Sequence, residues 1–316
     1  MAFFSRSCIR RCLFGATAAG LCLKASICIA AAEERNQTAE NSPTVIKLYQ
    51  YQTCPFCSKV RVFLDYHGIP YEKVEVNPLF KKELKFATTK KVPLVVVGDV
   101  QLQESSLIIS ILKSQSLGSR TLSEVMGCYP EIKSKDAKGR EVIEHGNKYE
   151  VMLGSTENSD ARREEVKWRM WVDNKLIHAL APNIYRTLGE ARRSFNYISS
   201  VGNFTVVERY GAQIVGSFAM YFIGRKLKKK YKLDEDVRQS LYSYCREWTT
   251  AVGKKRLFMG GNDPNLADLA VYGVLNAIEG MDAFNDVMVN TDIKPWYLRV
   301  QQAIRVRSSE TKTPSS

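Results

Sequence analysis

Hydrophobic and polar positions between residues 44 and 114 alternate in a way that predicts strands and helices in turn. Short apolar or alternating runs are typical of strands, and apolar positions three or four residues apart are typical of helices. The expected elements are a strand at 45–50, a helix at 58–67, a strand at 71–76, a short helix at 81–87, strands at 93–97 and 100–103, and a helix at 105–113. Strand, helix, strand, helix, hairpin and helix in this order predict an α/β domain with the thioredoxin fold.

The pattern changes after residue 114. Residues 115–160 are polar without a regular period, and we expect an irregular connecting region there. From residue 161 apolar side chains recur at helical spacing, which predicts an all-α domain over 161–305. The clearest apolar stripe consists of Val237, Leu241, Tyr244, Cys245, Trp248 and Val252. Residues 306–316 are expected to form a disordered tail.

Two helix starts in the second half can be predicted from capping residues. Thr187 and Glu190 have the spacing of a capping box. Asn265 can cap a further helix while Asp268, three residues later, reaches back to the backbone before it. Because the rest of that helix is apolar, we expect Asp268 to have a structural role.

The first 43 residues differ from the remainder of the chain. Residues 1–32 contain arginines and apolar residues but no acid, and residues 33–43 have the polar composition of a linker. Three interpretations stay open for this segment: a secretory signal peptide, a mitochondrial presequence or a membrane anchor. An anchor or presequence is favoured, because the cysteine pair described below requires a reducing compartment.

The charge and cysteine content narrow the function classes. The formal net charge is +13, but no nucleic-acid-binding motif accompanies the basic runs, so no nucleic acid partner is expected. The run 225–232 is either a solvated helix end or a patch attracted to anionic lipid. Three scattered histidines offer no second ligand pair for zinc beside Cys54 and Cys57, so no metal site is expected.

The main candidate for chemistry is the Cys54-Pro55-Phe56-Cys57 sequence, which lies between the first strand and the first helix. A thiolate at a helix N-terminus is stabilised by unpaired backbone N–H groups and by the helix dipole. Cys54 occupies that position, and Cys57 can resolve a mixed disulfide one turn later. Tyr51 either directs its hydroxyl to the Cys54 sulfur or packs on the sheet.

Two further motifs accompany the cysteines. Val92-Pro93 precedes an apolar strand and is a candidate for a cis peptide bond. Glu104-Ser105 stands at the start of a helix, where Ser105 is a suitable cap and where backbone amides can bind a carboxylate. Together with Cys54 and Phe56, these motifs resemble the glutathione site of glutaredoxins and glutathione transferases. By this resemblance, Val92 pairs with the cysteinyl part of glutathione, and Glu104 and Ser105 hold its γ-glutamyl group.

Longer segments make the resemblance more specific. The sequence is similar to the membrane-associated prostaglandin E synthase type 2 family at residues 48–61, 74–78, 146–149, 182–187, 264–275 and 295–300. The family often has Asp at the position of Glu104. The resemblance implies a glutaredoxin-like domain followed by an all-α domain like the C-terminal domain of glutathione transferases. It also implies a homodimer that binds glutathione, can hold haem together with glutathione, and associates with Golgi or mitochondrial membranes through its N-terminal segment or occurs as a processed soluble cytoplasmic form.

Three functional hypotheses follow. The first is an isomerase that converts prostaglandin H2, a lipid endoperoxide, to prostaglandin E2 through a thiol at Cys54, with Tyr51 orienting the thiolate and Phe56 forming an apolar wall. The second is a general glutathione-dependent thiol–disulfide oxidoreductase in which Cys57 is the resolving residue. The third is a non-catalytic, membrane-attached protein that binds haem or an iron–sulfur cluster with Cys54 as a ligand.

Overall fold

The computed structural model describes residues 45–135, 139, 141–152, 159–205, 208 and 211–310. The N-terminal segment and linker expected at 1–43 lie outside these residues. Within the described part of the chain, no helix has both the length and the apolar character needed to cross a bilayer.

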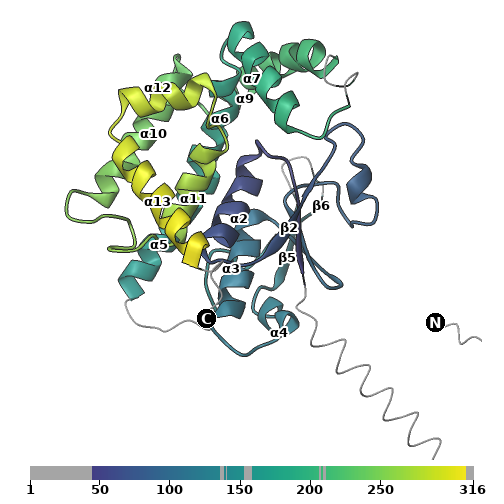
Figure 1. Ribbon diagram of the computed structural model, residues 1–316, viewed down its shortest axis with the longest axis vertical. Coiled ribbons are helices and arrows are strands. Elements are labelled where there is room, and N and C mark those ends of the chain that lie inside the picture. The colour runs from purple at the N-terminus through teal and green to yellow at the C-terminus, as the bar shows by residue number, and fades with distance from the viewer. Residues whose placement is uncertain are drawn as a thin grey trace, which may run out of the picture. The chain divides into compact units, whose positions relative to one another are not determined.

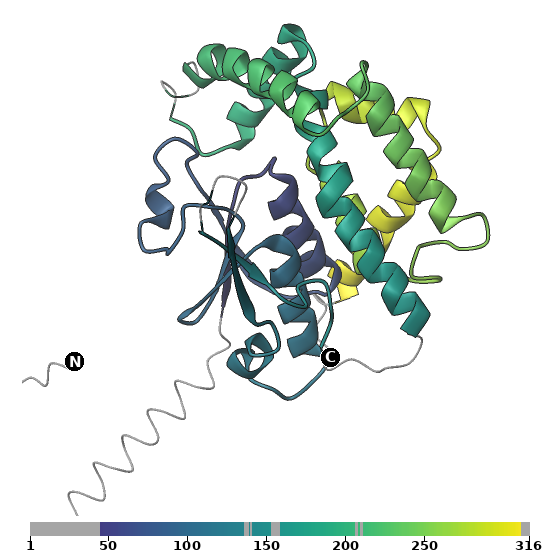
Figure 2. The ribbon, with the colours of Figure 1, turned by 180° about the vertical axis from the view of Figure 1, so that it is seen from behind.

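The first half contains a mixed four-stranded sheet with the strand order β2-β1-β3-β4. β1 (Ile46–Gln50) runs parallel to β2 (Tyr71–Glu75) and antiparallel to β3 (Leu94–Val97), which pairs with β4 (Val100–Gln103). Helices α2 (Pro55–Tyr66) and α3 (Ser105–Ser116) pack against each other beside this sheet, as Figures 1 and 2 show. The thioredoxin-like fold predicted from the sequence is therefore confirmed. A 3₁₀ turn, η1 (Lys82–Leu84), takes the place of the short helix expected at 81–87.

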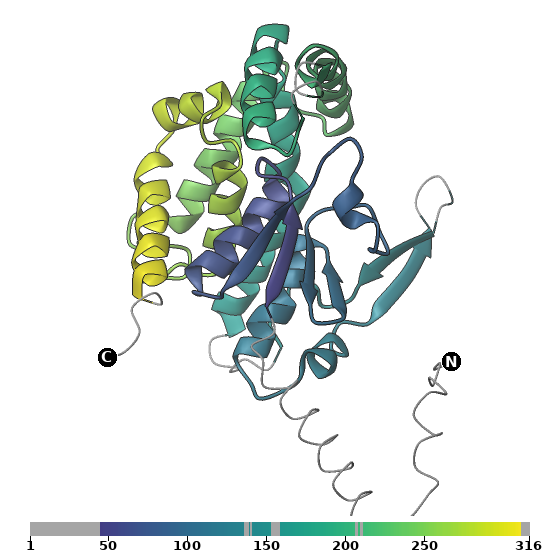
Figure 3. The same ribbon diagram turned by 45° about the vertical axis from the view of Figure 1, so that its right-hand side comes forward.

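The region after the sheet is more regular than expected. It contains α4 (Leu122–Met126) and a hairpin of β5 (Glu131–Lys135) and β6 (Glu141–His145), in which Lys133 lies opposite Ile143. Figure 3 shows this hairpin extending away from the four-stranded sheet. The prediction of an irregular segment at 115–160 was wrong here. Both faces of the hairpin are largely exposed, so it lacks the apolar alternation that marks a half-buried strand.

The second half is helical. It consists of α5 (Ser159–Trp171), the π-helical turn η2 (Val172–Leu176), α6 (Ile177–Ile184), α7 (Leu188–Val201), the π-helical turn η3 (Ala212–Gly216), α9 (Ser217–Lys230), α10 (Val237–Val252), α11 (Leu266–Asn276), α12 (Asp282–Asn290) and α13 (Lys294–Glu310). Trp248 is fully buried and makes edge-to-face contacts with Trp168 and Trp296. Because α13 continues to Glu310, the disordered tail expected from residue 306 does not begin there.

The two predicted capping residues stand at the starts of α7 and α11. The side chain of Thr187 accepts a hydrogen bond from the Glu190 N–H (3.1 Å). Asn265 and Asp268 form a reciprocal capping box. The Asp268 carboxylate is fully buried and also accepts hydrogen bonds from Met259 N, Gly260 N and Trp296 Nε1 (2.9–3.0 Å). Its predicted structural role matches this environment.

The helix that carries the cysteine pair is held by α11, as Figure 1 shows. At Gly273 on α11, a Cβ atom would lie 2.9 Å from the Lys59 Cα atom, closer than real side chains approach a backbone. A residue without a side chain is therefore required where α11 crosses α2. This contact fixes the position of α2 and, with it, the position of Cys54.

Candidate active site

Cys54 occupies the N-cap position of α2, where the sequence predicted it. Its N–H donates to the Tyr51 carbonyl (3.1 Å), and its own carbonyl accepts from Ser58 N (2.9 Å), which closes the turn between β1 and α2. The side chain is partly exposed, whereas Cys57, one helical turn later, is fully buried. Cys54 is therefore the cysteine of the pair that a substrate can reach.

The two thiols have pKa values shifted in opposite directions. A hydrogen bond from the Cys57 side chain lowers the pKa of Cys54, with backbone N–H groups of Cys57 and Phe56 and the charge of Arg61 adding to the effect against the cost of burial. Burial raises the pKa of Cys57, and the nearby Cys54 raises it further. Cys54 is therefore the more acidic thiol of the pair, and Cys57 is the hydrogen-bond donor.

This donor role leads to a prediction about Cys57. We expect Cys57→Ala to raise the pKa of Cys54 towards that of an ordinary cysteine, because the largest stabilising hydrogen bond is removed. Cys57→Ser keeps a hydroxyl donor and should preserve more of the shift. The pH dependence of Cys54 alkylation by iodoacetamide, followed by mass spectrometry, measures both. Identical alkylation profiles for the two variants would contradict this assignment.

Arg61 links the cysteine helix to the end of the neighbouring strands. Its guanidinium donates to Gln50 Oε1 (2.5 Å) and to the Gln52 carbonyl (2.8 Å). Glu75 accepts from Gln50 Nε2 (3.0 Å) and from Gln52 N (2.6 Å), which completes the network. These bonds hold the turn that precedes Cys54. They also place a buried positive charge near its sulfur.

Tyr51 and Val92 lie on a common apolar cluster. Both pack, partly buried, against Val76, Leu84 and Leu94. Burial raises the pKa of Tyr51 to about 12, and the charges of the two cysteines contribute to the same shift, so the ring lies close to them. The Tyr51 hydroxyl therefore stays protonated near neutral pH and is available as a hydrogen-bond donor.

Val92-Pro93 and Glu104-Ser105 are the other two motifs that the sequence predicted for the site. The Val92–Pro93 peptide bond is cis, as the sequence motif suggested. Glu104, not Ser105, is the N-cap residue of α3, and its φ of 63° lies in the left-handed region that costs a non-glycine residue about 1–3 kcal/mol. The Glu104 side chain is 44 % exposed and Ser105 is buried. The Glu104 carboxylate makes no capping hydrogen bond to α3 and lies 3.8 Å from Lys148 Nζ.

A buried polar network lies beneath this turn. The Lys59 ammonium on α2 is 1 % exposed, donates to Ser106 Oγ on α3 (2.9 Å) and forms an ion pair with Asp173 in the π-helical turn η2. Asp173 also accepts from Ser106 Oγ (2.6 Å) and from the Tyr149 hydroxyl (3.1 Å). Burial lowers the pKa of Lys59. For Asp173, the ion pair with Lys59 and the hydrogen bonds outweigh burial and lower its pKa.

Arg169 adds a second buried cation to the network. Its guanidinium donates to the Tyr149 carbonyl (2.5 Å), to Ser110 Oγ (2.8 Å) and to the Ser106 carbonyl (3.0 Å). The start of α3 is thus bonded to α2, to the loop after β6 and to the helical half of the chain. The exposed Glu104 and the buried Ser105 stand at the start of this rigidly held helix.

Comparison with known proteins identifies the family. Residues 48–120 match the family model of the glutathione S-transferase N-terminal domain. Prostaglandin E synthase 2 from Danio rerio is 50 % identical over 280 residues, which cover 85 % of this chain and 74 % of that protein. Prostaglandin E synthase 2 from Mus musculus is 51 % identical over 269 residues, 82 % of this chain and 70 % of that protein. The chain belongs to the prostaglandin E synthase 2 family. It is therefore one of a family of enzymes.

A solved structure supports the fold. The β-etherase from a Sphingobium species superimposes with a TM-score of 0.51 at 14 % sequence identity, over 84 % of this chain and 99 % of that protein. At this identity the similarity concerns the fold alone. The architecture of this prostaglandin E synthase 2 family member is thus a thioredoxin-like domain joined to a helical domain, as the sequence predicted.

The buried network in this family member was not predicted from the sequence; it consists of Lys59, Ser106, Tyr149, Arg169 and Asp173. In the sequence, only Lys59 pointed to this network, because it is a charged residue that lies between Cys57 and the apolar side chains of α2. Of the other cysteines, Cys245 lies in the core, where burial raises its pKa to about 12. Among the residues that the structure describes, no group of three or more His, Cys, Asp or Glu side chains could hold a metal ion.

Proposed function

We propose that this protein is a glutathione-dependent isomerase that converts prostaglandin H2 to prostaglandin E2 through a thiol at Cys54. The observation that carries the proposal is the partly exposed Cys54, whose thiol has a lowered pKa at the N-terminus of α2. Membership of the prostaglandin E synthase 2 family supports the substrate, since the relatives carry that name. The match to the glutathione S-transferase N-terminal domain supports the use of glutathione.

The proposed chemistry begins at the peroxide bond. The thiolate attacks one of the two peroxide oxygens, so an S–O bond forms, the O–O bond breaks, and the other oxygen leaves as an alkoxide and takes up a proton. Removal of the proton from the carbon that bears the S–O group then forms the ketone, and the S–O electrons return to sulfur. The thiolate is regenerated, and the reaction has no net oxidation or reduction.

The residues around Cys54 have separate roles in this proposal. Tyr51 donates a hydrogen bond that orients the thiolate or the attacked oxygen, and the 37 % exposed ring of Phe56 provides an apolar wall for the lipid. The backbone of Val92, fixed by Pro93, pairs with the cysteinyl part of glutathione. Glu104 binds the amino group of the γ-glutamyl end, and the first amides of α3 with Ser105 bind its carboxylate.

The main alternative, a general thiol–disulfide oxidoreductase, differs in its need for Cys57. We expect Cys57→Ser to keep isomerase activity within about tenfold of the wild type and to lose reduction of a protein disulfide, because only the second reaction needs a resolving thiol. Prostaglandin E2 formation by mass spectrometry and insulin disulfide reduction measure the two activities. Cys128→Ser is the control. Equal loss of both activities in Cys57→Ser would favour the oxidoreductase.

Haem binding is a further part of the proposal. His67 contacts the Phe63 carbonyl and Lys113 Nζ through its two ring nitrogens, and His178 stacks on Tyr231 at 4.0 Å between ring centroids. We propose that Cys54, with the thiol of bound glutathione, would hold a haem through sulfur and that the haem would then compete with the lipid for Cys54.

Membrane association and assembly belong to the same proposal. We infer that residues 1–32 anchor or target the protein to a Golgi or mitochondrial membrane, with the described domains in a reducing compartment or released as a processed soluble form. The four described cysteines are all free thiols, which agrees with such a compartment. By family resemblance the protein is also proposed to be a homodimer.

A further inference from the structure

Helix α9 exposes its large side chains and buries its small ones. Ser217 and Gly224 face the interior, where the Gly224 position lies against Tyr185 and a Cβ at Gly216 would collide with Phe195. Phe218 and Phe222 are 54 % and 63 % exposed. An ordinary amphipathic helix of a soluble protein has the reverse arrangement, with its apolar stripe facing the core.

The exposed apolar side chains continue into the turn before α9. Ile214 and Val215 in η3 are 65 % and 70 % exposed, and together with Phe218 and Phe222 they form what we name the α9 apolar stripe. α9 lies at the upper edge of the molecule in Figure 2. Isolated exposed apolar residues are common on protein surfaces, but a contiguous group of large ones marks an interaction site.

Basic residues follow the apolar stripe along the same helix face. Lys226, Lys229 and Lys230 are exposed, and residues 211–230 contain no acid. Phe222 and Lys226 are one helical turn apart. The surface therefore combines an apolar half with a strongly positive half.

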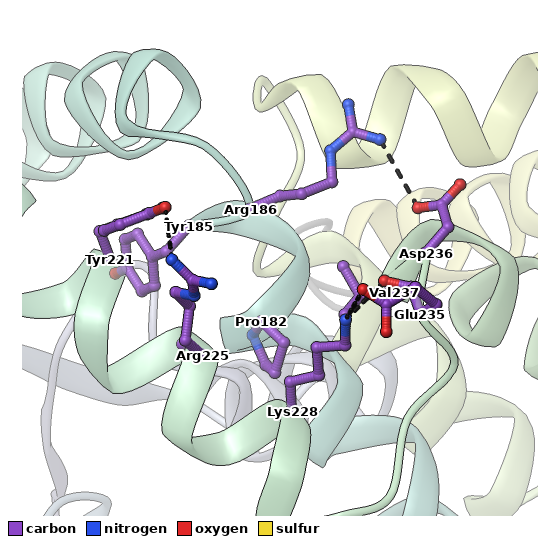
Figure 4. Close-up of a pocket in the computed structure, with 10 residues that line it drawn as sticks. Pro182, Tyr185, Arg186, Tyr221, Arg225, Lys228, Glu235, Asp236 and Val237 are labelled. Carbon is purple, nitrogen blue, oxygen red and sulfur yellow. Dashed lines mark hydrogen bonds and ion pairs between the residues drawn. The ribbon is translucent and has the colours of Figure 1, made fainter.

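The inner side of α9 contrasts with this outer face. A cavity of about 240 Å³ lies between α9 and α6, and Figure 4 shows its charged lining residues. Lys228 is paired there with Glu235 (3.3 Å), and Arg186 lies 3.8 Å from Asp236. The cations on this side are thus partly neutralised by the chain itself.

We infer that α9 and η3 form a membrane-contacting surface that lies flat on an anionic bilayer. The apolar stripe enters the boundary between headgroups and acyl chains, and the lysines contact lipid phosphates or carboxylates. Charge complementarity selects an anionic membrane over a second copy of this chain, because two copies would bring like charges together. The helix is too short and too basic to span a bilayer, which agrees with a position in the interface plane. This surface acts in addition to residues 1–32.

The position of tryptophans allows a direct test in the full-length protein. Trp168, Trp171, Trp248 and Trp296 are at most 9 % exposed, so their fluorescence should be quenched little by membranes. We expect a tryptophan introduced by Phe222→Trp to be quenched strongly by vesicles of phosphatidylserine and phosphatidylcholine with brominated acyl chains. Val289→Trp on α12, at a position 82 % exposed, is the matched control and should be quenched little.

Replacement of lysines by glutamate tests the basic part of this surface. We expect Lys226→Glu with Lys229→Glu to reduce the quenching of the tryptophan at position 222 by these vesicles about tenfold or more, and 0.5 M salt to have a similar effect without these two substitutions. Equal quenching of the tryptophans at positions 222 and 289 would overturn the inference. So would a Phe218→Ser, Phe222→Ser variant that binds vesicles normally but changes from dimer to monomer, because the face would then belong to a second copy.

Discussion

Replacement of Cys54 by serine is expected to reduce prostaglandin E2 formation by about two orders of magnitude or more. A serine hydroxyl at this position is not ionised near neutral pH. The backbone N–H groups of Phe56 and Cys57 and the Cys57 thiol then have no thiolate to stabilise. The rate should be measured by mass spectrometry of the product at saturating glutathione. Binding of glutathione should change much less than the rate, since Glu104 and Ser105 are untouched.

A control variant and the glutathione dependence of the remaining activity test the role of Cys54. Cys128→Ser removes a partly exposed cysteine in the turn after α4 and should retain wild-type activity. A Cys54→Ser variant that isomerises the endoperoxide at the wild-type rate would show that Cys54 is not the nucleophile. If its remaining activity rises with glutathione concentration, the attacking thiolate belongs to glutathione and Cys54 serves to position it.

Replacement of Asp268 by alanine is expected to lower the free energy of unfolding by about 3–5 kcal/mol. The carboxylate accepts hydrogen bonds from Met259 N, Gly260 N and Asn265 N and from Trp296 Nε1, all at 2.9–3.1 Å in a buried site. Alanine leaves these donors without a partner, and each unsatisfied buried group costs about 1–3 kcal/mol, partly offset by water or rearrangement. The capping box of α11 is lost as well.

Urea unfolding followed by tryptophan fluorescence measures this effect, since Trp296 contacts the carboxylate directly. Asp263→Ala is the matched control from the same loop: its side chain is 74 % exposed and paired with Arg307 at 3.3 Å, so a loss of at most about 1 kcal/mol is expected. If both variants had similar free energies of unfolding, Asp268 would not have the predicted structural role.

The sequence predicted those features that depend on neighbouring residues. The strand–turn–helix around Cys54 and the caps at Thr187 and Asn265 follow from local spacing, and each is present in the structure. The assignment of Ser105 as a cap was displaced by one residue, because the backbone at Glu104 adopts a left-handed conformation that glycine would normally occupy. Local propensity does not predict such strain.

Features that depend on distant residues could not be predicted. The partners of Lys59 come from positions 106 and 173, and a lysine in a helix is usually solvated, so the sequence pattern gave no reason to bury it. The hairpin of β5 and β6 was missed because Ile132, Val142 and Ile143 are all substantially exposed. Without a buried face, a strand has no alternation to recognise.

The ion pair between Lys59 and Asp173 links the two halves of this enzyme, so neither half contains both partners of the pair. The ammonium belongs to the glutaredoxin-like half, whereas the carboxylate that balances it belongs to the helical half. If the first half were transplanted alone, Lys59 would lose its carboxylate partner, and the face of α2 that Gly273 of α11 covers would be exposed to water. The thiol-bearing domain is therefore not a portable module in its present sequence, because the helical half completes the burial of its first helix.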